Sequence, residues 1–173
     1  MKKVTLFISV VLLLMTTTAF AQDFNSKNAR IEDYNLTPIP SFNLAKSSTR
    51  IRKIVSNQDT LFLYQIEIFS NGSTLKPLLA SLTKAEITEA REALTILLEQ
   101  SKADANSKAD YIDNQYKFES GFSVGYVVNN KKVSWVLVQD NKVREEVFFV
   151  KDINSIVKSF SEAKIRIEQL EKE

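Results

Sequence analysis

FSVGYVVNNKKVSWVLV, residues 122–138, is the stretch of sequence that decides the fold. Apolar and small residues alternate on both sides of a polar centre, which is the pattern of two β-strands joined by a tight turn. With Asn129-Asn130 in the turn, Val124 lies opposite Trp135 and one face of the hairpin is apolar. This face is predicted to belong to the core, with Trp135 at its centre.

Two further strands flank this hairpin, at residues 115–120 and 143–150. A three-residue turn at 140–142 places Val147 on the face that carries Trp135, whereas a two-residue turn places Arg144, Glu146 and Phe148 there. The longer turn is therefore predicted. Because all four strands are short and separated by polar turns, we expect them to pair with antiparallel neighbours.

Three strands are predicted in the first half of the chain, at 49–56, at 60–70 and in the segment that follows Asn71-Gly72. Asn-Gly is the strongest short hairpin signal, since a type I′ turn needs positive φ at both of its central residues. Pro77 cannot donate a hydrogen bond to a neighbouring strand, so the third strand is predicted to lie at an edge of the sheet.

An amphipathic helix follows each group of strands. Thr83 and Glu86 have the spacing of a capping box, and apolar residues recur at helical spacing from Ile87 to Leu98. The second helix is predicted to begin near Asp152 and to continue to Leu170. The expected fold is α+β, mainly antiparallel, with six to seven strands in the order βββ-α-ββββ-α and two layers.

Residues 1–21 have the pattern of a signal peptide. Lys2-Lys3 precedes an apolar run, and Ala19-Phe20-Ala21 is the small-x-small pattern at which signal peptidase cleaves. The apolar run is too short for a membrane-spanning helix of about 20 residues. We therefore expect cleavage between Ala21 and Gln22, with no membrane span left in the mature chain.

Cleavage would leave 152 of the 173 residues and would remove two lysines and no acidic residue. The 23 basic residues then fall to 21 against 21 acidic ones, so the formal net charge falls from +2 to zero. Nucleic acid is not an expected partner of a chain without net positive charge. Residues 22–48, polar and with Pro38 and Pro40, are predicted to form an extended leader, and 49–173 a single domain.

The absence of Cys and His excludes many chemistries. Ser-His-Asp and Cys-His catalysis, disulfides and the usual zinc, copper and haem sites all need these residues. Residues 104–110 begin like a calcium-binding loop, but Lys108, Ala109 and Gln115 stand where that loop needs an oxygen ligand, Gly and Glu. No metal and no cofactor are predicted. The absence of Cys and the Met-Lys-Lys start indicate a periplasmic or secreted protein of a bacterial envelope.

Paired carboxylates are the remaining route to catalysis. Glycoside hydrolysis needs two carboxyl groups about 5–10 Å apart across a sugar-binding cleft. No spacing in the sequence enforces such a pair, so enzymatic activity is not predicted. The carboxylates considered for this role are Glu67, Glu119, Asp140, Glu145 and Glu146.

Two surfaces are candidates for binding. The first is a possible anion patch, for which the alternative is a strand face that carries charge only against solvent. The second is a docking face of small side chains with a tyrosine at its rim, for which the alternative is a surface covered by the second helix or the leader. The anion patch comprises Arg50, Arg52 and Lys53, and the docking face comprises Ser123, Gly125, Tyr126 and Ser134.

These observations favour an exported, non-enzymatic binding domain of the bacterial envelope, whose partner is a protein or a polymer. A carrier of a small apolar, lipid-like ligand is the alternative, with the ligand enclosed between sheet and helix. A carboxylate-based hydrolase is the third choice.

Overall fold

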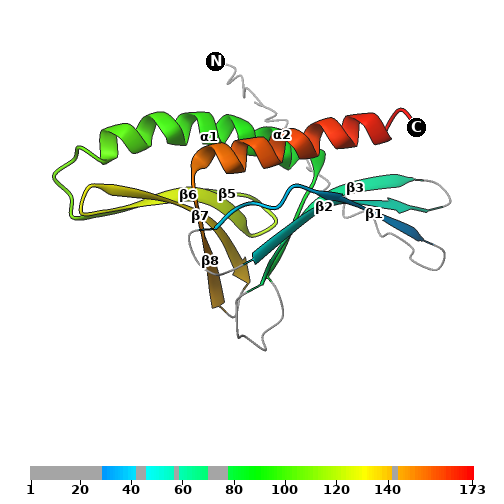
Figure 1. Ribbon diagram of the computed structural model, residues 1–173, viewed down its shortest axis with the longest axis horizontal. Coiled ribbons are helices and arrows are strands. Elements are labelled where there is room, and N and C mark those ends of the chain that lie inside the picture. The colour runs from blue at the N-terminus through cyan, green and yellow to red at the C-terminus, as the bar shows by residue number, and fades with distance from the viewer. Residues whose placement is uncertain (1–28, 42–45, 57–58, 70–77, 142–143) are drawn as a thin grey trace, which may run out of the picture.

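The computed structural model describes residues 29–41, 46–56, 59–69, 78–141 and 144–173. Eight strands and two helices follow one another in these residues, with the four strands of each half preceding a helix (Figure 1). The elements are β1 (Arg30–Leu36), β2 (Lys46–Val55), β3 (Thr60–Phe69), β4 (Leu78–Leu82), α1 (Lys84–Asp104), β5 (Tyr111–Lys117), β6 (Phe122–Asn129), β7 (Lys132–Asn141), β8 (Arg144–Val150) and α2 (Ile153–Leu170).

The strands form two separate sheets in which every neighbouring pair is antiparallel. The first sheet has the order β1-β2-β3-β4 and the second has the order β5-β6-β7-β8. The prediction of an antiparallel α+β fold is confirmed, and β4 lies at an edge of its sheet as expected. The described residues form eight strands where about six to seven were predicted, because β1 forms within the stretch that was predicted to be a leader.

β1 is a strand with mixed polarity on both faces, which explains why the sequence pattern does not reveal it. Tyr34 and Leu36 point toward the core and are partly buried against it. Asp33, on the opposite face, lies beside Arg52 of β2 and forms an ion pair with it. Cross-strand charge pairing thus takes the place of the apolar alternation that identifies most strands.

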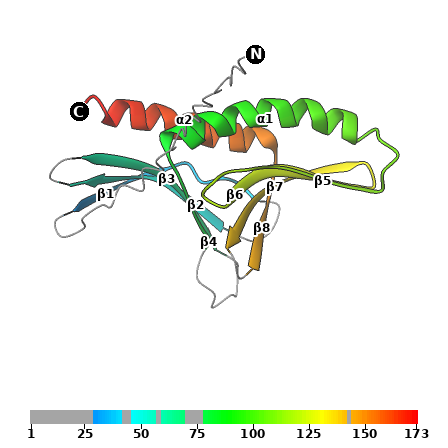
Figure 2. The same ribbon diagram turned by 180° about the vertical axis from the view of Figure 1, so that it is seen from behind.

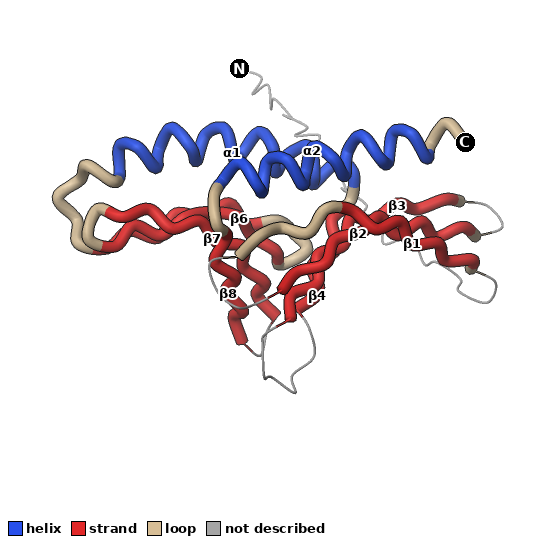
Figure 3. Tube along the Cα trace, in the orientation of Figure 1, coloured by secondary structure: helices blue, strands red, loops and turns tan. Residues whose placement is uncertain are grey.

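The two helices lie on one side of both sheets and cover them in exchanged order (Figures 2 and 3). α1 follows the first sheet but packs chiefly on β6 and β5, whereas α2 follows the second sheet and packs on β2 and β1 as well as β8. Lys84 at the start of α1 forms an ion pair with Glu171 just beyond α2, so the helices run antiparallel. One core therefore extends through both halves; it includes Tyr64, Phe160, Tyr126 and Leu94.

The hairpin of β6 and β7 forms, with a register two residues away from the predicted one. Asn130 and Lys131, with φ of 49° and 63°, occupy the turn, and Tyr126 pairs with Trp135. This register brings Val128 opposite Val133 and leaves Lys131 in the turn, so the apolar match across the hairpin improves. Trp135 is only 8% exposed, as predicted, and its ring meets that of Tyr126 edge-on at 5.4 Å.

The predicted three-residue turn between the last two strands is wrong. Asn141 pairs with Arg144, which leaves a two-residue connection, and the alternation along β8 is the reverse of the predicted one. Phe148 is buried in the core, whereas Val147 lies on the other face and is 47% exposed. Burial of a phenylalanine removes more apolar area from water than burial of a valine, which favours this register.

Both predicted helix starts are confirmed. Thr83 and Glu86 form the reciprocal bonds of a capping box, and the side chain of Asp152 accepts a hydrogen bond from the Ser155 amide. The turn at Asn71-Gly72 lies outside the described residues, as does the site of signal-peptide cleavage. Among the helices of the described ranges, none has the length and apolar character needed to cross a membrane.

Candidate functional site

The residues of the predicted anion patch lie on both faces of β2. Arg50 and Arg52 share the outer face of the first sheet, the face turned away from the helices, and each binds a carboxylate through two nitrogens. The partners are Glu67 for Arg50 and Asp33 for Arg52. Both cations are thus engaged within the sheet. Anion binding by Arg50, Arg52 and Lys53 stays a prediction.

These ion pairs lower the pKa values of the two carboxylates. Hydrogen bonds from Arg52 hold the pKa of Asp33 below its ordinary value, and hydrogen bonds from Arg50 do the same for Glu67. Glu67 is therefore ionised at neutral pH, and its carboxylate is bound by Arg50. Lys53 belongs to the opposite face, where its ammonium lies 5.9 Å from the centre of the Phe62 ring.

The other carboxylates considered for catalysis are not brought to Glu67 by any described contact. Glu119 is exposed in the connection between β5 and β6. The side chains of Asp140, Glu145 and Glu146 lie outside the described residues.

The four residues of the predicted docking face do not share one face of the second sheet. Ser123, Gly125 and Ser134 lie on the outer face, but Tyr126 points to the opposite side, toward α1. Ser123 is 3% exposed, and its hydroxyl donates to the Gln115 side chain on the neighbouring strand. Docking on this face stays a prediction.

Gly125 lies where another backbone approaches β6 closely. A Cβ atom added to Gly125 would lie 2.2 Å from the carbonyl oxygen of Asn114 and 2.7 Å from Cα of Gln115. Both atoms belong to the backbone of β5. The glycine therefore permits β5 and β6 to lie close together.

Tyr126 fixes the C-terminal end of α1 to the second sheet. Its hydroxyl donates to Asp104 at 2.6 Å and accepts from the Asn114 amide at 3.0 Å. Burial, together with the bond to Asp104, raises the pKa of Tyr126 to about 12. Asp104, the first residue of the calcium-like stretch, is thus engaged with a tyrosine; in the described part of the chain no group of three or more acidic side chains could hold a metal ion.

A groove lies at the other end of the molecule, between the end of β1 and one side of α2. Its volume is about 670 Å³. It has two apolar side chains, three charged ones and four with hydroxyl or amide groups, so it can contact both apolar and polar parts of a ligand. The lining residues are Asn35, Leu36, Thr37, Lys158, Ser161, Glu162, Ile165, Arg166 and Gln169.

The β1 side of this groove is held in place by hydrogen bonds from two other elements. The Glu162 carboxylate of α2 accepts from both the amide and the hydroxyl of Thr37, at 3.3 and 3.2 Å. From β2, the Thr49 hydroxyl donates to the carbonyl of Thr37 and the Ser47 hydroxyl donates to that of Ile39. The wall formed by the end of β1 is therefore positioned before any ligand arrives.

The α2 side of the groove presents a preorganised cation. The guanidinium of Arg166 lies over the Tyr34 ring, 4.9 Å from its centre, and this contact holds the side chain beside β1. Its polar contacts are long: a hydrogen bond to the Gln169 side chain at 3.3 Å and an ion pair with Glu173 at 4.0 Å. Such an arginine can still form a bidentate pair with a carboxylate.

Ile165 and Lys158 complete the α2 side of the groove. Ile165 is 55% exposed and lies off the apolar stripe of α2, and Lys158 is exposed about two turns earlier. Sequence reasoning missed this site because it needs β1, which was not predicted. The one signal in the sequence was an isoleucine on the polar side of an amphipathic helix.

Comparison with known proteins assigns no family: no family model matches the chain, and no curated protein matches it significantly. The groove between β1 and α2 therefore has to be interpreted from its own chemistry.

Proposed function

We propose that this chain is an exported, non-enzymatic binding domain of a bacterial envelope, which presents the groove between β1 and α2 to a protein partner. The observation that supports this function best is the groove itself, which combines a positioned strand end, an exposed isoleucine and an arginine without a strong carboxylate partner.

Binding at the surface is also favoured over enclosure of a lipid-like ligand. A carrier would hold its ligand between the helices and the inner faces of the sheets. In this protein that space contains packed side chains; Tyr64 and Phe160, for example, meet edge-on at 5.7 Å and are both fully buried.

Export is proposed from the pattern of residues 1–21 and has its own test. The mature protein recovered from the envelope or the medium should begin at Gln22, which N-terminal sequencing or intact mass will establish. Recovery of a chain that retains residues 1–21 would contradict export by cleavage.

The binding function can be tested in cells with a photo-crosslinking amino acid in place of Ile165. Illumination should give one discrete protein adduct, because Ile165 projects into the groove. The matched control is the same amino acid in place of Ile96, which is 60% exposed on α1 and outside the groove. Equal adducts at both positions, or none at Ile165, would argue against the groove as a binding site.

A further inference from the structure

We infer that the partner of this groove is an extended acidic peptide segment, which adds to the free edge of β1 as a fifth strand of the first sheet. This inference rests on the proposed function and specifies its partner. The recognised chemistry is a peptide backbone in β conformation with carboxylate side chains on the face turned toward α2.

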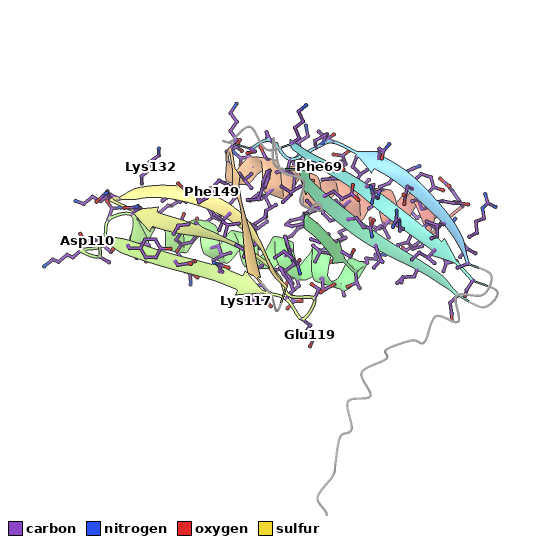
Figure 4. All side chains as sticks on the ribbon, turned by 90° about the horizontal axis from the view of Figure 1, so that it is seen from below. Phe69, Asp110, Lys117, Glu119, Lys132 and Phe149 are labelled. Carbon is purple, nitrogen blue, oxygen red and sulfur yellow. The ribbon has the colours of Figure 1, made fainter. Side chains whose placement is uncertain are left out.

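The edge of β1 provides the backbone contacts. β1 is the outermost strand of the first sheet, paired with β2 on one side and, among the described strands, with none on the other (Figure 4). An unpaired strand edge carries alternating N–H and C=O groups that can pair with an added strand. The groove begins where β1 ends, at Asn35, Leu36 and Thr37, and α2 forms its other wall. A peptide between an edge strand and a helix is a known mode of strand addition.

The two edges of the second sheet are less suited to an acidic strand. The end of β8 is already occupied, because Val150 forms a bridge with Ser41 and the Lys151 amide donates to the carbonyl of Pro40. β5 has acidic and amide side chains beside it on α1: Tyr116 is bonded to Glu89, and Asn114 to Gln100. The edge of β1 is different because the helix beside it offers cations.

The charges of the groove select a carboxylate. Its one acidic residue, Glu162, already accepts two hydrogen bonds from Thr37. Lys158 and Arg166 remain, and Arg166 contrasts with Arg50 and Arg52, which are both bound to carboxylates through two nitrogens. An arginine fixed over a ring and lacking such a partner is suited to bidentate recognition of a carboxylate.

The spacing of the cations predicts the spacing of the acidic residues. Lys158 and Arg166 are eight residues apart on α2, which corresponds to about 12 Å along the helix. Side chains on one face of a strand recur every second residue, and four residues of a strand span about 13 Å. The peptide should therefore carry acidic residues at positions i and i+4, with an aliphatic residue on the same face between them, at i+2.

The experiment uses a blocked synthetic peptide of sequence Thr-Glu-Thr-Val-Thr-Glu-Thr and the signal-free protein, with affinity measured by calorimetry. We expect saturable binding of this probe and none of its counterpart with Lys in place of Glu. Arg166→Gln should weaken binding about tenfold or more, since a hydrogen bond to a charged group is lost. Lys158→Gln, at an exposed position, should weaken it a few-fold without affecting the fold.

Lys102→Gln is the matched control. It removes a positive charge from α1, where the side chain is 63% exposed and outside both the groove and β1. It should leave the affinity of the probe unchanged. Equal binding of the Glu and Lys peptides, or full affinity in both Lys158→Gln and Arg166→Gln, would overturn the inference.

Two N-methylated probes test the strand pairing itself. Alternate amides of an added strand point toward β1, so methylation of one alternating set should abolish binding and methylation of the other set should not. Retention of binding by both probes would overturn strand addition. If the probe fails to bind while the crosslinker at Ile165 still gives a discrete adduct, the inference fails and the proposed function stands; loss of that adduct would instead contradict the proposed function.

Discussion

Replacement of Gly125 by alanine should destabilise the protein through a clash between two backbones. The added methyl carbon would lie 2.2 Å from the Asn114 carbonyl oxygen, 2.7 Å from Cα of Gln115 and 2.9 Å from its Cγ. Ordinary van der Waals contacts of a Cβ begin at 3.4 Å. Because two of the three obstacles are backbone atoms of β5, a rotamer change cannot relieve the clash, and the strand itself has to move.

The expected loss follows from two opposing terms. Overpacking in a well-packed region costs up to about 3 kcal/mol, and a backbone obstacle favours the upper end of that range. Alanine restricts the unfolded chain more than glycine does, which returns about 0.5–1 kcal/mol. The free energy of unfolding should thus fall by about 2 kcal/mol, and the melting temperature by about 4–8 °C.

Urea denaturation followed by tryptophan fluorescence measures this loss, because the chain has one tryptophan and Trp135 is buried. Ser123→Ala is the matched control: it lies on the same strand and face, and it removes only the hydrogen bond to Gln115, for a cost of about 1 kcal/mol. A Gly125→Ala variant within about 0.5 kcal/mol of the parent would refute the close approach of β5 and β6.

Three further predictions concern the core, a helix start and the first sheet. Tyr64→Phe leaves the buried Ser159 hydroxyl without its 2.6 Å partner and should lower the unfolding free energy by about 1–2 kcal/mol in urea titrations. Thr83→Ala removes the capping box of α1 and should cost about 1 kcal/mol by the same assay; an unchanged midpoint would contradict the cap. In the folded state the pKa values of Asp33 and Glu67 lie below their ordinary values of 3.8 and 4.5. The two ionised carboxylates therefore stabilise the fold at pH values above their ordinary pKa values, and this stabilisation is lost as the pH falls through the pKa values of the folded state. Stability should therefore decline below about pH 4, and a variant with Asp33→Asn and Glu67→Gln should decline less steeply over that range.

Strong periodic signals in the sequence predicted most elements and both helix starts. The hairpin register was missed by two residues because Lys131 adopts positive φ, which a lysine rarely does. Local turn preference favoured Asn129-Asn130, but the pairing of Tyr126 with Trp135 and the exclusion of Lys131 from the sheet depend on packing across the whole hairpin. Tertiary packing therefore decided the register against the local preference.

The candidate site was harder to predict than the fold. β1 lacks a clear apolar alternation, and its pairing depends on Asp33 meeting Arg52, which lies 19 residues away along the chain. Because the end of β1 forms one wall of the groove, the groove cannot be predicted without that strand. From the sequence alone, Arg166 and Ile165 are therefore indistinguishable from other surface residues of an amphipathic helix. When a residue becomes part of a site only through a long-range strand pairing, the sequence around that residue carries little indication of the site.

Hydrogen–deuterium exchange of β1 in the presence of the acidic probe peptide tests strand addition most directly. Among the described strands none pairs with the outer edge of β1, and an added strand should slow the exchange of the amides there. The account predicts increased protection of Arg30–Leu36 on peptide binding, with little change in β5 or β8. Saturation by the peptide without any gain of protection in β1, or with protection at the edge of the second sheet, would contradict it.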